Sequence, residues 1–268
     1  LSEICEDAVG KLSLTRWPTV RSVRTIRNPY STVYVIELRS GSLKQRVYVK
    51  CPHSEYYDKK ALIKQLNNEY EVMNEASQRT AKDAAYGVAV PVGFYPDYPA
   101  IATLEAGRRT IRDDVKYFAR IGAPRFAYEP MVLKVSNCGA WLRMFQETTE
   151  QPPAPFDTKK LKSYCSVRLD YLLRKGDTPF SEERAAEIIE AMDRCATEMS
   201  PGENRVVGCH GDYTAHNILA SHGKVWILDF SMFKYDSYAY DPCNFAFDIE
   251  MLQIDLLQSQ LPLNPLQE

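Results

Sequence analysis

Several features that would assign the chain to a broad class of protein are missing. None of the seven cysteines forms a Cys-x-x-Cys pair, so the sequence indicates neither a structural zinc site nor a disulfide framework. No apolar run approaches the roughly 20 residues that a membrane-spanning helix needs. The formal net charge of −2 supplies no bulk attraction for nucleic acid or for an anionic membrane. The N-terminal segment is too polar for a signal peptide. We therefore expect a cytoplasmic protein without a membrane span or a nucleic-acid partner, and the oligomeric state stays open.

What is present has the balance of an ordinary globular protein. Hydrophobic residues make up 45% of the 268 residues and charged residues 25%. This length is enough for one large domain or for two lobes that share a cleft.

The first hundred residues predict a small antiparallel sheet and one helix. Segments rich in Val, Ile and Tyr, separated by turn-forming residues, predict strands at 20–26, 32–38, 45–51, 88–96 and 100–107. A helix is expected at 59–80, because its apolar residues recur at spacings of three and four. Glu69 lies in the middle of that apolar face, where an unpaired carboxylate would cost several kcal/mol. Glu69 therefore needs a cationic partner.

The remainder of the chain is mainly helical, with two further strands. Residues 108–201 read as helical patches interrupted by loops, and 181–199 is the clearest helix. Strands are expected at 206–212 and 224–230, and a helix at about 244–258.

The segment CHGDYTAHNIL, residues 209–219, carries the densest group of chemically active side chains. His210, Asp212 and His216 are possible zinc ligands, but they fall in an expected turn, and the chain has no HExxH motif and no second His/Asp cluster. A second interpretation is phosphoryl transfer, which needs a base near the acceptor hydroxyl and oxygen ligands for metal ions on the phosphates. A hairpin that returns Asp229 beside Asp212 and Asn217 would provide all three, and we favour this interpretation.

The same residues resemble a known family. HGDYTAHNIL followed by VWILDF and a later Asp-Pro pair is similar to the aminoglycoside phosphotransferase and choline kinase-like family, which shares the protein-kinase fold. The matching residues are His210, Gly211, Asp212, Asn217, Ile218, Leu219, Asp229, Phe230, Asp241 and Pro242. The resemblance implies an α+β bilobal fold, with a nucleotide-binding lobe at 1–106 and a helical lobe carrying the catalytic loop and substrate pocket at 107–268. It also implies that Asp212 is the catalytic base, that Asn217 and Asp229 bind Mg²⁺, and that His210 braces the catalytic loop.

The N-terminal lobe offers an independent check on this resemblance. A kinase needs a strand lysine for the α- and β-phosphates and a helix glutamate paired with that lysine. Lys50 ends the predicted strand VYVK, and Glu69 already requires a cation. We therefore expect Lys50 and Glu69 to form the pair that positions the phosphates of ATP or GTP.

Two further parts of a nucleotide site are less complete. Thr103, Leu104 and Glu105 lie in the predicted fifth strand, where the chain should lead into the hinge between the lobes, and they are candidates to offer backbone groups to the nucleotide base. The glycine-rich loop of kinases is missing, because the first turn reads Asn-Pro-Tyr-Ser-Thr at 28–32. Ser31 and Thr32 are candidates to donate hydrogen bonds to a phosphate group, and the alternative is that they are plain turn and strand residues.

The acceptor is expected to be the hydroxyl of a small molecule. Only eleven residues separate Asp229 from Asp241, which is too few for the activation segment of a protein kinase. A sugar, a glycoconjugate, an aminoglycoside or an amino alcohol all remain possible. Carboxylates that would suit a polycation follow the motif at Asp236, Asp241, Asp248, Glu250 and Asp255. Aromatic rings that would suit a sugar or a quaternary ammonium group lie in and after the motif, at Tyr213, Phe233, Tyr235, Tyr238 and Tyr240. The alternatives are a non-catalytic kinase-like scaffold and a protein kinase.

Overall fold

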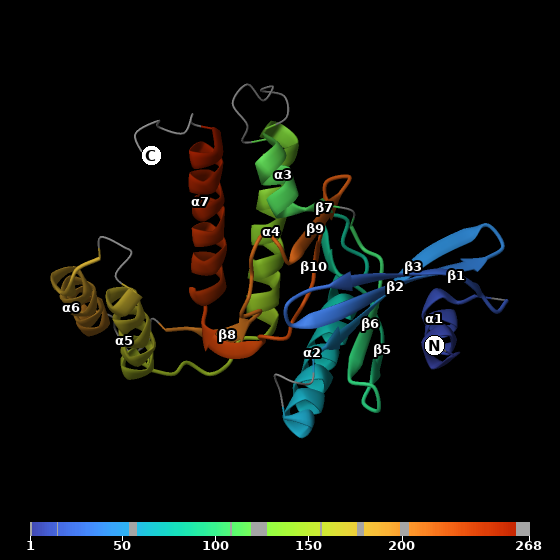
Figure 1. Ribbon diagram of the computed structural model, residues 1–268, viewed down its shortest axis with the longest axis horizontal. Coiled ribbons are helices and arrows are strands. Elements are labelled where there is room, and N and C mark those ends of the chain that lie inside the picture. Colours follow the sequence, from blue (N-terminus) through green and yellow to red (C-terminus); the bar gives the residue numbers. More distant parts are fainter. Residues whose placement is uncertain are drawn as a thin grey trace. The chain divides into compact units, whose positions relative to one another are not determined.

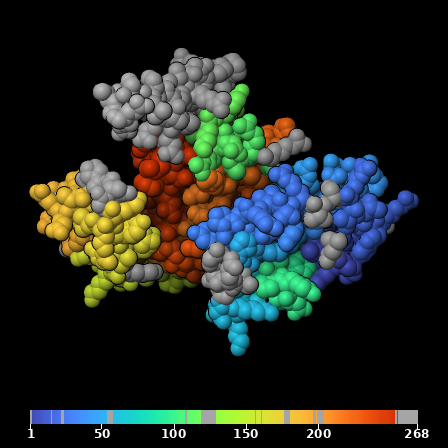
Figure 2. Space-filling model, in the orientation of Figure 1, coloured from blue at the N-terminus to red at the C-terminus, as the bar shows by residue number. Residues whose placement is uncertain are grey.

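The computed structural model describes residues 2–14, 16–53, 58–107, 109–118, 128–155, 157–175, 180–198 and 204–260. Figure 1 shows the helices and strands, and Figure 2 shows the surface of the molecule in the same orientation. Contacts divide the chain into two units. The first unit contains residues 1–145, 210–234 and 239–268, and the second contains 146–209 and 235–238. The predicted lobe boundary at residues 106 and 107 falls inside the first unit, and it stays a prediction about how nucleotide and acceptor binding are divided.

A five-stranded antiparallel sheet in the order β1-β2-β3-β6-β5 dominates the N-terminal part of the first unit. Its strands are β1 (Thr19–Arg27), β2 (Ser31–Ser40), β3 (Leu43–Pro52), β5 (Pro91–Tyr95) and β6 (Ala100–Leu104). The predicted meander is confirmed, and β3 is an interior strand in which Lys50 pairs with Val33 and Ile101. The single strand expected at 88–96 is wrong: β4 (Tyr86–Val88) belongs to another sheet and is separate from β5.

The first residues of the chain form a helix that the sequence did not predict. In α1 (Ser2–Leu12) the buried residues are Cys5 and Ala8, which pack against the sheet residues Ile36 and Val47. Tyr95 Oη on β5 donates a hydrogen bond of 2.8 Å to Asp7 Oδ2 on α1. Because small side chains make this contact, α1 lacks the wide apolar stripe by which an amphipathic helix is recognised.

Helix α2 (Lys59–Thr80) has the predicted bounds. It begins at Asp58, whose side chain accepts a hydrogen bond of 3.0 Å from the backbone N–H of Ala61 and so caps the helix. The face of α2 that contacts the sheet buries Leu62, Leu66 and Glu69. The expected burial of Glu69 within an apolar face is therefore confirmed.

A second sheet, in the order β4-β10-β9-β7, contains a hairpin and joins distant parts of the first unit. Strands β9 (Ile218–Ser221) and β10 (Lys224–Ile227) form the antiparallel hairpin, β4 pairs with β10 in parallel, and β7 (Arg109–Thr110) pairs with β9. Helices α3 (Ile111–Phe118), α4 (Tyr128–Thr148) and α7 (Tyr240–Gln260) supply the rest of the unit. Their core surrounds Trp141, which is fully buried and stacks on Phe145 and Tyr213 at ring distances of 4.9 and 5.4 Å.

The second unit contains α5 (Thr158–Lys175), α6 (Glu182–Glu198), β8 (Val206–Cys209) and most of β11 (Lys234–Ser237). Helices α5 and α6 contact each other, and Lys162 on α5 forms an ion pair of 2.7 Å with Asp193 on α6. The predicted helix at 181–199 is confirmed as α6. Among the described helices, none is long and apolar enough to cross a bilayer.

Candidate active site

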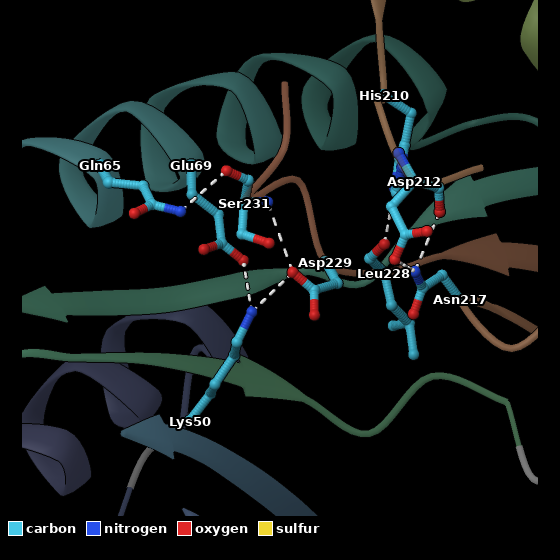
Figure 3. A network of polar contacts seen from close by, with 9 residues as sticks. All are labelled: Lys50, Gln65, Glu69, His210, Asp212, Asn217, Leu228, Asp229 and Ser231. Atoms are coloured by element: carbon cyan, nitrogen blue, oxygen red, sulfur yellow. Dashed lines mark hydrogen bonds and ion pairs between the residues drawn. The ribbon is translucent and has the colours of Figure 1, made fainter. Parts of the chain in front are cut away.

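Three charged side chains from three different elements meet in the first unit (Figure 3). The ammonium group of Lys50 on β3 lies 3.3 Å from Oε1 of Glu69 on α2 and 2.6 Å from Oδ1 of Asp229 after β10. The Glu69 side chain is only 2% exposed, whereas those of Lys50 and Asp229 are 25% and 35% exposed. Lys50 is therefore the cation that the buried glutamate requires, as expected, and it also holds a carboxylate that reaches solvent.

Burial and charge act in opposite directions on these groups. Burial raises the pKa of Glu69 to about 7, although Lys50 acts against that rise. Burial would lower the pKa of Lys50, but the two neighbouring carboxylates outweigh it and raise that pKa. Burial would raise the pKa of Asp229, but Lys50 outweighs it and lowers that pKa. Oε2 of Glu69 is buried without a hydrogen-bond partner among the described residues, which adds to the tendency of this carboxylate to take up a proton.

Asp229 lies in a sharp turn and not in a strand. The strand predicted at 224–230 ends at Ile227, because Asp229 adopts a φ of +61° in the left-handed region. Within this turn the backbone N–H of Ser231 donates to Asp229 Oδ1 at 3.4 Å. Gln65 on α2, one helical turn before Glu69, donates its side-chain N–H to the Ser231 carbonyl at 3.0 Å. Helix α2 is therefore connected to the Asp229 turn at two points. Gln65 contacts the turn directly, and Glu69 is connected to it through Lys50, which pairs with both Glu69 and Asp229.

The loop after β8 is fastened to the start of α7. The strand predicted at 206–212 ends at Cys209, and Gly211 has a φ of +85°. A Cβ atom on Gly211 would lie 2.0 Å from the Met232 carbonyl oxygen, so only glycine fits there. The buried carboxylate of Asp241 accepts the backbone N–H groups of His210 at 2.6 Å and of Gly211 at 3.0 Å. These contacts set the path of the chain immediately before Asp212.

His210 is fully buried and has a partner on each ring nitrogen. Nε2 lies 2.7 Å from the Leu228 carbonyl oxygen, which can only accept, so Nε2 carries the proton. Nδ1 then accepts the backbone N–H of Asp212 at 3.3 Å. Burial lowers the pKa of His210, in agreement with a neutral ring. The imidazole joins the loop to the Asp229 turn, and this geometry fits the bracing role expected for it.

Asp212 and Asn217 face each other across the loop (Figure 3). Nδ2 of Asn217 donates to the backbone carbonyl of Asp212 at 2.9 Å and to Asp212 Oδ2 at 2.8 Å. Because both partners are acceptors, the amide nitrogen must face them, and Oδ1 of Asn217 is turned away as an oxygen ligand. The Leu228 N–H donates to the Asn217 carbonyl at 2.9 Å, so the hairpin brings Asn217 next to the segment that ends in Asp229.

Ser31 and Thr32, the two candidate hydrogen-bond donors to a phosphate, lie in different surroundings. Ser31 lines a cavity of about 300 Å³, together with Lys50, Glu69, Asp229 and residues of α2 and of the Asp229 turn. Thr32 is not among the lining residues, and its hydroxyl is 3.0 Å from Nε2 of His53. Ser31 therefore shares a cavity with the three charged groups, and Thr32 does not.

The three residues that are candidates to bind the base of the nucleotide lie at the end of β6. Thr103 pairs with Tyr48, two residues from Lys50 on β3. The backbone N–H of Leu104 donates to the Val90 carbonyl at 2.9 Å, and that of Glu105 donates to the Arg46 carbonyl at 2.8 Å. Because these two N–H groups are already used, Leu104 and Glu105 retain only their carbonyl oxygens for a base.

For two residues that shape the site, the sequence did not reveal the role that the structure shows. Gln65 could have been identified, because it lies four residues before Glu69 on the same face of α2. Asp241 was noted as part of a pattern, but only the structure shows its carboxylate binding two backbone N–H groups.

Comparisons with known proteins agree with this geometry. Residues 138–255 match the model of the phosphotransferase enzyme family. A solved glucosamine kinase structure superposes with a TM-score of 0.56 at 14% identity, over 99% of this chain and 80% of that one. Choline kinase from Cryptosporidium parvum Iowa II superposes with a TM-score of 0.50 at 13% identity, over 93% of this chain and 70% of that one.

A further similar structure is the GDP and kanamycin complex of APH(2")-IIia, with a TM-score of 0.50 at 13% identity, over 92% of this chain and 79% of that one. No curated protein sequence matches the chain. At these identities the superpositions establish the fold alone. The chain thus has the α+β protein-kinase-like fold of small-molecule phosphotransferases, and its residues 138–255 match the phosphotransferase enzyme family, as its HGDYTAHNIL motif led us to expect.

Proposed function

We propose that this protein is a kinase that transfers the terminal phosphoryl group of ATP or GTP to a hydroxyl of a small molecule. The observation that carries this proposal is the contact of Lys50 with both Glu69 and Asp229, beside the hairpin that bears Asp212 and Asn217. Phosphoryl transfer depends mainly on positioning and on charges that oppose the developing negative charge. These five side chains supply a base, a phosphate-binding cation and oxygen ligands for a metal.

Asp212 is the base in this proposal. Its carboxylate is exposed, and it is oriented by the amide of Asn217 and by the bracing of the loop through His210 and Asp241. An acceptor hydroxyl that donates to Asp212 would have its oxygen aligned for attack on the terminal phosphorus. The carboxylate would take up the proton as the new P–O bond forms, and the bond from that phosphorus to the bridging oxygen would break, so that the nucleoside diphosphate leaves with the electron pair.

The oxygen donors fit a magnesium ion that is also bound by nucleotide phosphates. Asn217 Oδ1 and the Asp229 carboxylate are hard oxygen ligands, and Mg²⁺ in kinases uses few protein ligands together with phosphates and water. The described residues hold no cluster of three or more His, Cys, Asp or Glu side chains able to bind a metal alone, so the phosphates would complete the coordination. When bound, Mg²⁺ would neutralise phosphate charge. Lys50 now pairs with Asp229, and the phosphates would draw its ammonium group to themselves.

The remaining candidate residues would bind the other parts of the nucleotide. Ser31 shares the cavity with Lys50 and is placed to donate to a phosphate. The carbonyls of Thr103, Leu104 and Glu105 would receive donors from the base. Thr32 is a weaker candidate, because its hydroxyl is hydrogen-bonded to His53.

A small molecule is the better acceptor than a protein. Helix α7 begins at Tyr240, so no long activation segment separates it from Asp229. Glucosamine kinase, choline kinase and the kanamycin complex of APH(2")-IIia, which share the fold, are named for small molecules. We place the activity in the cytoplasm.

The test is ATP consumption measured over a panel of sugars, aminoglycosides, amino alcohols and peptides in the presence of Mg²⁺. Asp212→Asn should reduce turnover by at least about a hundredfold, because it removes the base, while the affinity for MgATP stays within about twofold. Asp97→Asn, in the exposed turn between β5 and β6, is the matched control and should keep full activity.

Turnover that is unchanged in Asp212→Asn would overturn the assignment of the base. MgATP binding without turnover of any panel member, in the wild type, would favour a non-catalytic nucleotide-binding scaffold. Turnover of peptides alone would favour a protein kinase.

A further inference from the structure

Arg112, in the first turn of α3, lies against the loop that carries Asp212. Its backbone N–H donates to the Ala215 carbonyl at 3.0 Å, and its guanidinium group contacts the imidazole of His216. His216 is exposed and lies directly before Asn217. A permanently charged side chain is therefore held beside the loop segment that joins Asp212 to Asn217.

The acidic groups around Arg112 already have other partners. Asp113 caps α3, since its Oδ2 accepts the Thr110 N–H at 3.2 Å while its own N–H donates to Thr110 Oγ1 at 3.0 Å. The buried Asp114 pairs with Lys134 at 2.6 Å. Asp248 on α7 accepts the Ala215 N–H at 2.7 Å.

Arg112 itself has donors to spare. In the described part of the chain, its guanidinium group forms no ion pair with a carboxylate. Its Nε is buried and has no acceptor there. A guanidinium group offers five N–H donors in a planar fork that matches the two oxygens of a carboxylate or phosphate. The segment between Asp212 and Asn217 thus has unused hydrogen-bond donors for an anion beside it.

The groups that surround His216 also favour an anion beside its imidazole. Burial, Arg112 and Lys116 lower the pKa of His216, while Asp248 and Asp212 act to raise it. Asp248 and Asp212 each already accept a hydrogen bond, from the Ala215 N–H and from the Asn217 side chain. Because the guanidinium group of Arg112 can only donate, the ring nitrogen of His216 that faces it accepts, and the other ring nitrogen carries the proton and can donate to an anion.

We propose that Arg112 and His216 bind an oxyanion group of the acceptor, so that the substrate is an acidic hydroxyl compound, such as a sugar acid or a sugar phosphate. This inference rests on the proposed function, because it takes Asp212 as the base that receives the acceptor hydroxyl. It disfavours polycationic acceptors and amino alcohols, whose ammonium groups would be repelled by Arg112 and Lys116.

A direct binding test uses sulfate as the probe in the presence of saturating Mg·AMP-PNP, which fills the nucleotide phosphate positions. The histidine ring signals are followed by NMR, and His216→Gln assigns the one that belongs to His216. In the wild type, sulfate should shift that signal saturably. Arg112→Gln should weaken the effect by at least about tenfold. Lys82→Gln, which removes an exposed cation beyond α2, should behave as the wild type. The absence of a saturable shift would overturn the proposal.

A second test compares glucuronate, glucose 6-phosphate, glucose and glucosamine as acceptors. At least one of the two acids should exceed glucosamine in kcat/KM by about tenfold or more, and the better acid tells carboxylate from phosphate recognition. Arg112→Gln should raise the KM of that acid and leave the KM of MgATP within about twofold. A preference for glucosamine, or an Arg112→Gln effect confined to MgATP, would overturn the proposal while leaving the proposed kinase activity standing. If no compound turns over, the sulfate titration decides. Sulfate binding in a protein that fails to bind Mg·AMP-PNP would refute the kinase assignment and keep the anion site.

Discussion

Lys50 and Asp229 are 179 residues apart in the chain, yet the ammonium nitrogen of one lies 2.6 Å from a carboxylate oxygen of the other. The same ammonium group also contacts Glu69, so a single cation neutralises two carboxylates from different elements. We therefore expect the ion pairs of the candidate site to contribute to the free energy of unfolding.

Replacing Lys50 with Met should therefore destabilise the protein. The substitution keeps the length of the side chain but leaves the buried Glu69 without a cation, at a cost of about 1–3 kcal/mol. Urea denaturation measures this loss. Glu69→Gln combined with Lys50→Met should recover part of it, because the amide carries no charge. A Lys50→Met protein as stable as the wild type would show that the ion pairs contribute nothing to folding.

The stability should also depend on pH through Glu69. Its pKa in the folded protein is raised to about 7, above the value near 4.3 expected for an unfolded chain. Between these two values the folded state binds a proton that the unfolded state lacks, so the free energy of unfolding should fall as pH rises from 5 to 7. The Glu69 contribution should reach about 1 kcal/mol per pH unit.

The control for this pH dependence is Glu69→Gln, which removes the titrating group. Unfolding measured at pH 5, 6 and 7 should show a smaller decline in Glu69→Gln than in the wild type. Parallel curves for the two proteins would contradict the assigned pKa.

Asp229→Asn should weaken the binding of nucleotide only when Mg²⁺ is present. The amide keeps the size of the side chain but loses the charge that would bind the metal, which we expect to cost about tenfold or more in affinity for Mg·ADP. Calorimetry with ADP, with and without Mg²⁺, separates the two cases. An equal loss under both conditions would instead indicate that Asp229 acts on the nucleotide through the fold.

Asp241→Asn should weaken the attachment of the proposed catalytic loop to the start of α7. The carboxylate accepts two backbone N–H groups, whereas an amide can place only one acceptor oxygen and turns a donor toward the other N–H. A loss of about 1.5–3 kcal/mol in unfolding free energy is expected. Hydrogen exchange at His210 and Gly211 should accelerate in this variant, and unchanged exchange there would rule out the proposed contact.

The sequence predicted the parts of the fold in which local pattern and tertiary environment agree. Helix α2 matched its predicted bounds because it has a capping Asp58 and one apolar face. Helix α1 was missed because it buries only the small residues Cys5 and Ala8. The strands predicted to reach Asp212 and Asp229 stop earlier, because Gly211 and Asp229 adopt left-handed backbone conformations that an apolar pattern does not reveal.

Within the candidate site, the Lys50–Glu69 pair was predictable because a carboxylate on an apolar helix face demands a cation. The contact of Arg112 with His216 was not, because it joins residues 104 positions apart that share no periodic pattern. The use of backbone N–H groups at Leu104 and Glu105 likewise depends on strand register, which local sequence leaves undetermined.

The stacking of Trp141 on Phe145 and Tyr213 makes its intrinsic fluorescence a probe of the packing around it. The chain has three tryptophans, and the indole of Trp141 is fully buried, with no acceptor for its N–H among the described residues. Such an environment shifts fluorescence to short wavelength, and an aqueous quencher will not reach it, whereas Trp17 is 58% exposed. Because Tyr213 directly follows Asp212, the emission of Trp141 reports on the packing beneath the proposed catalytic loop.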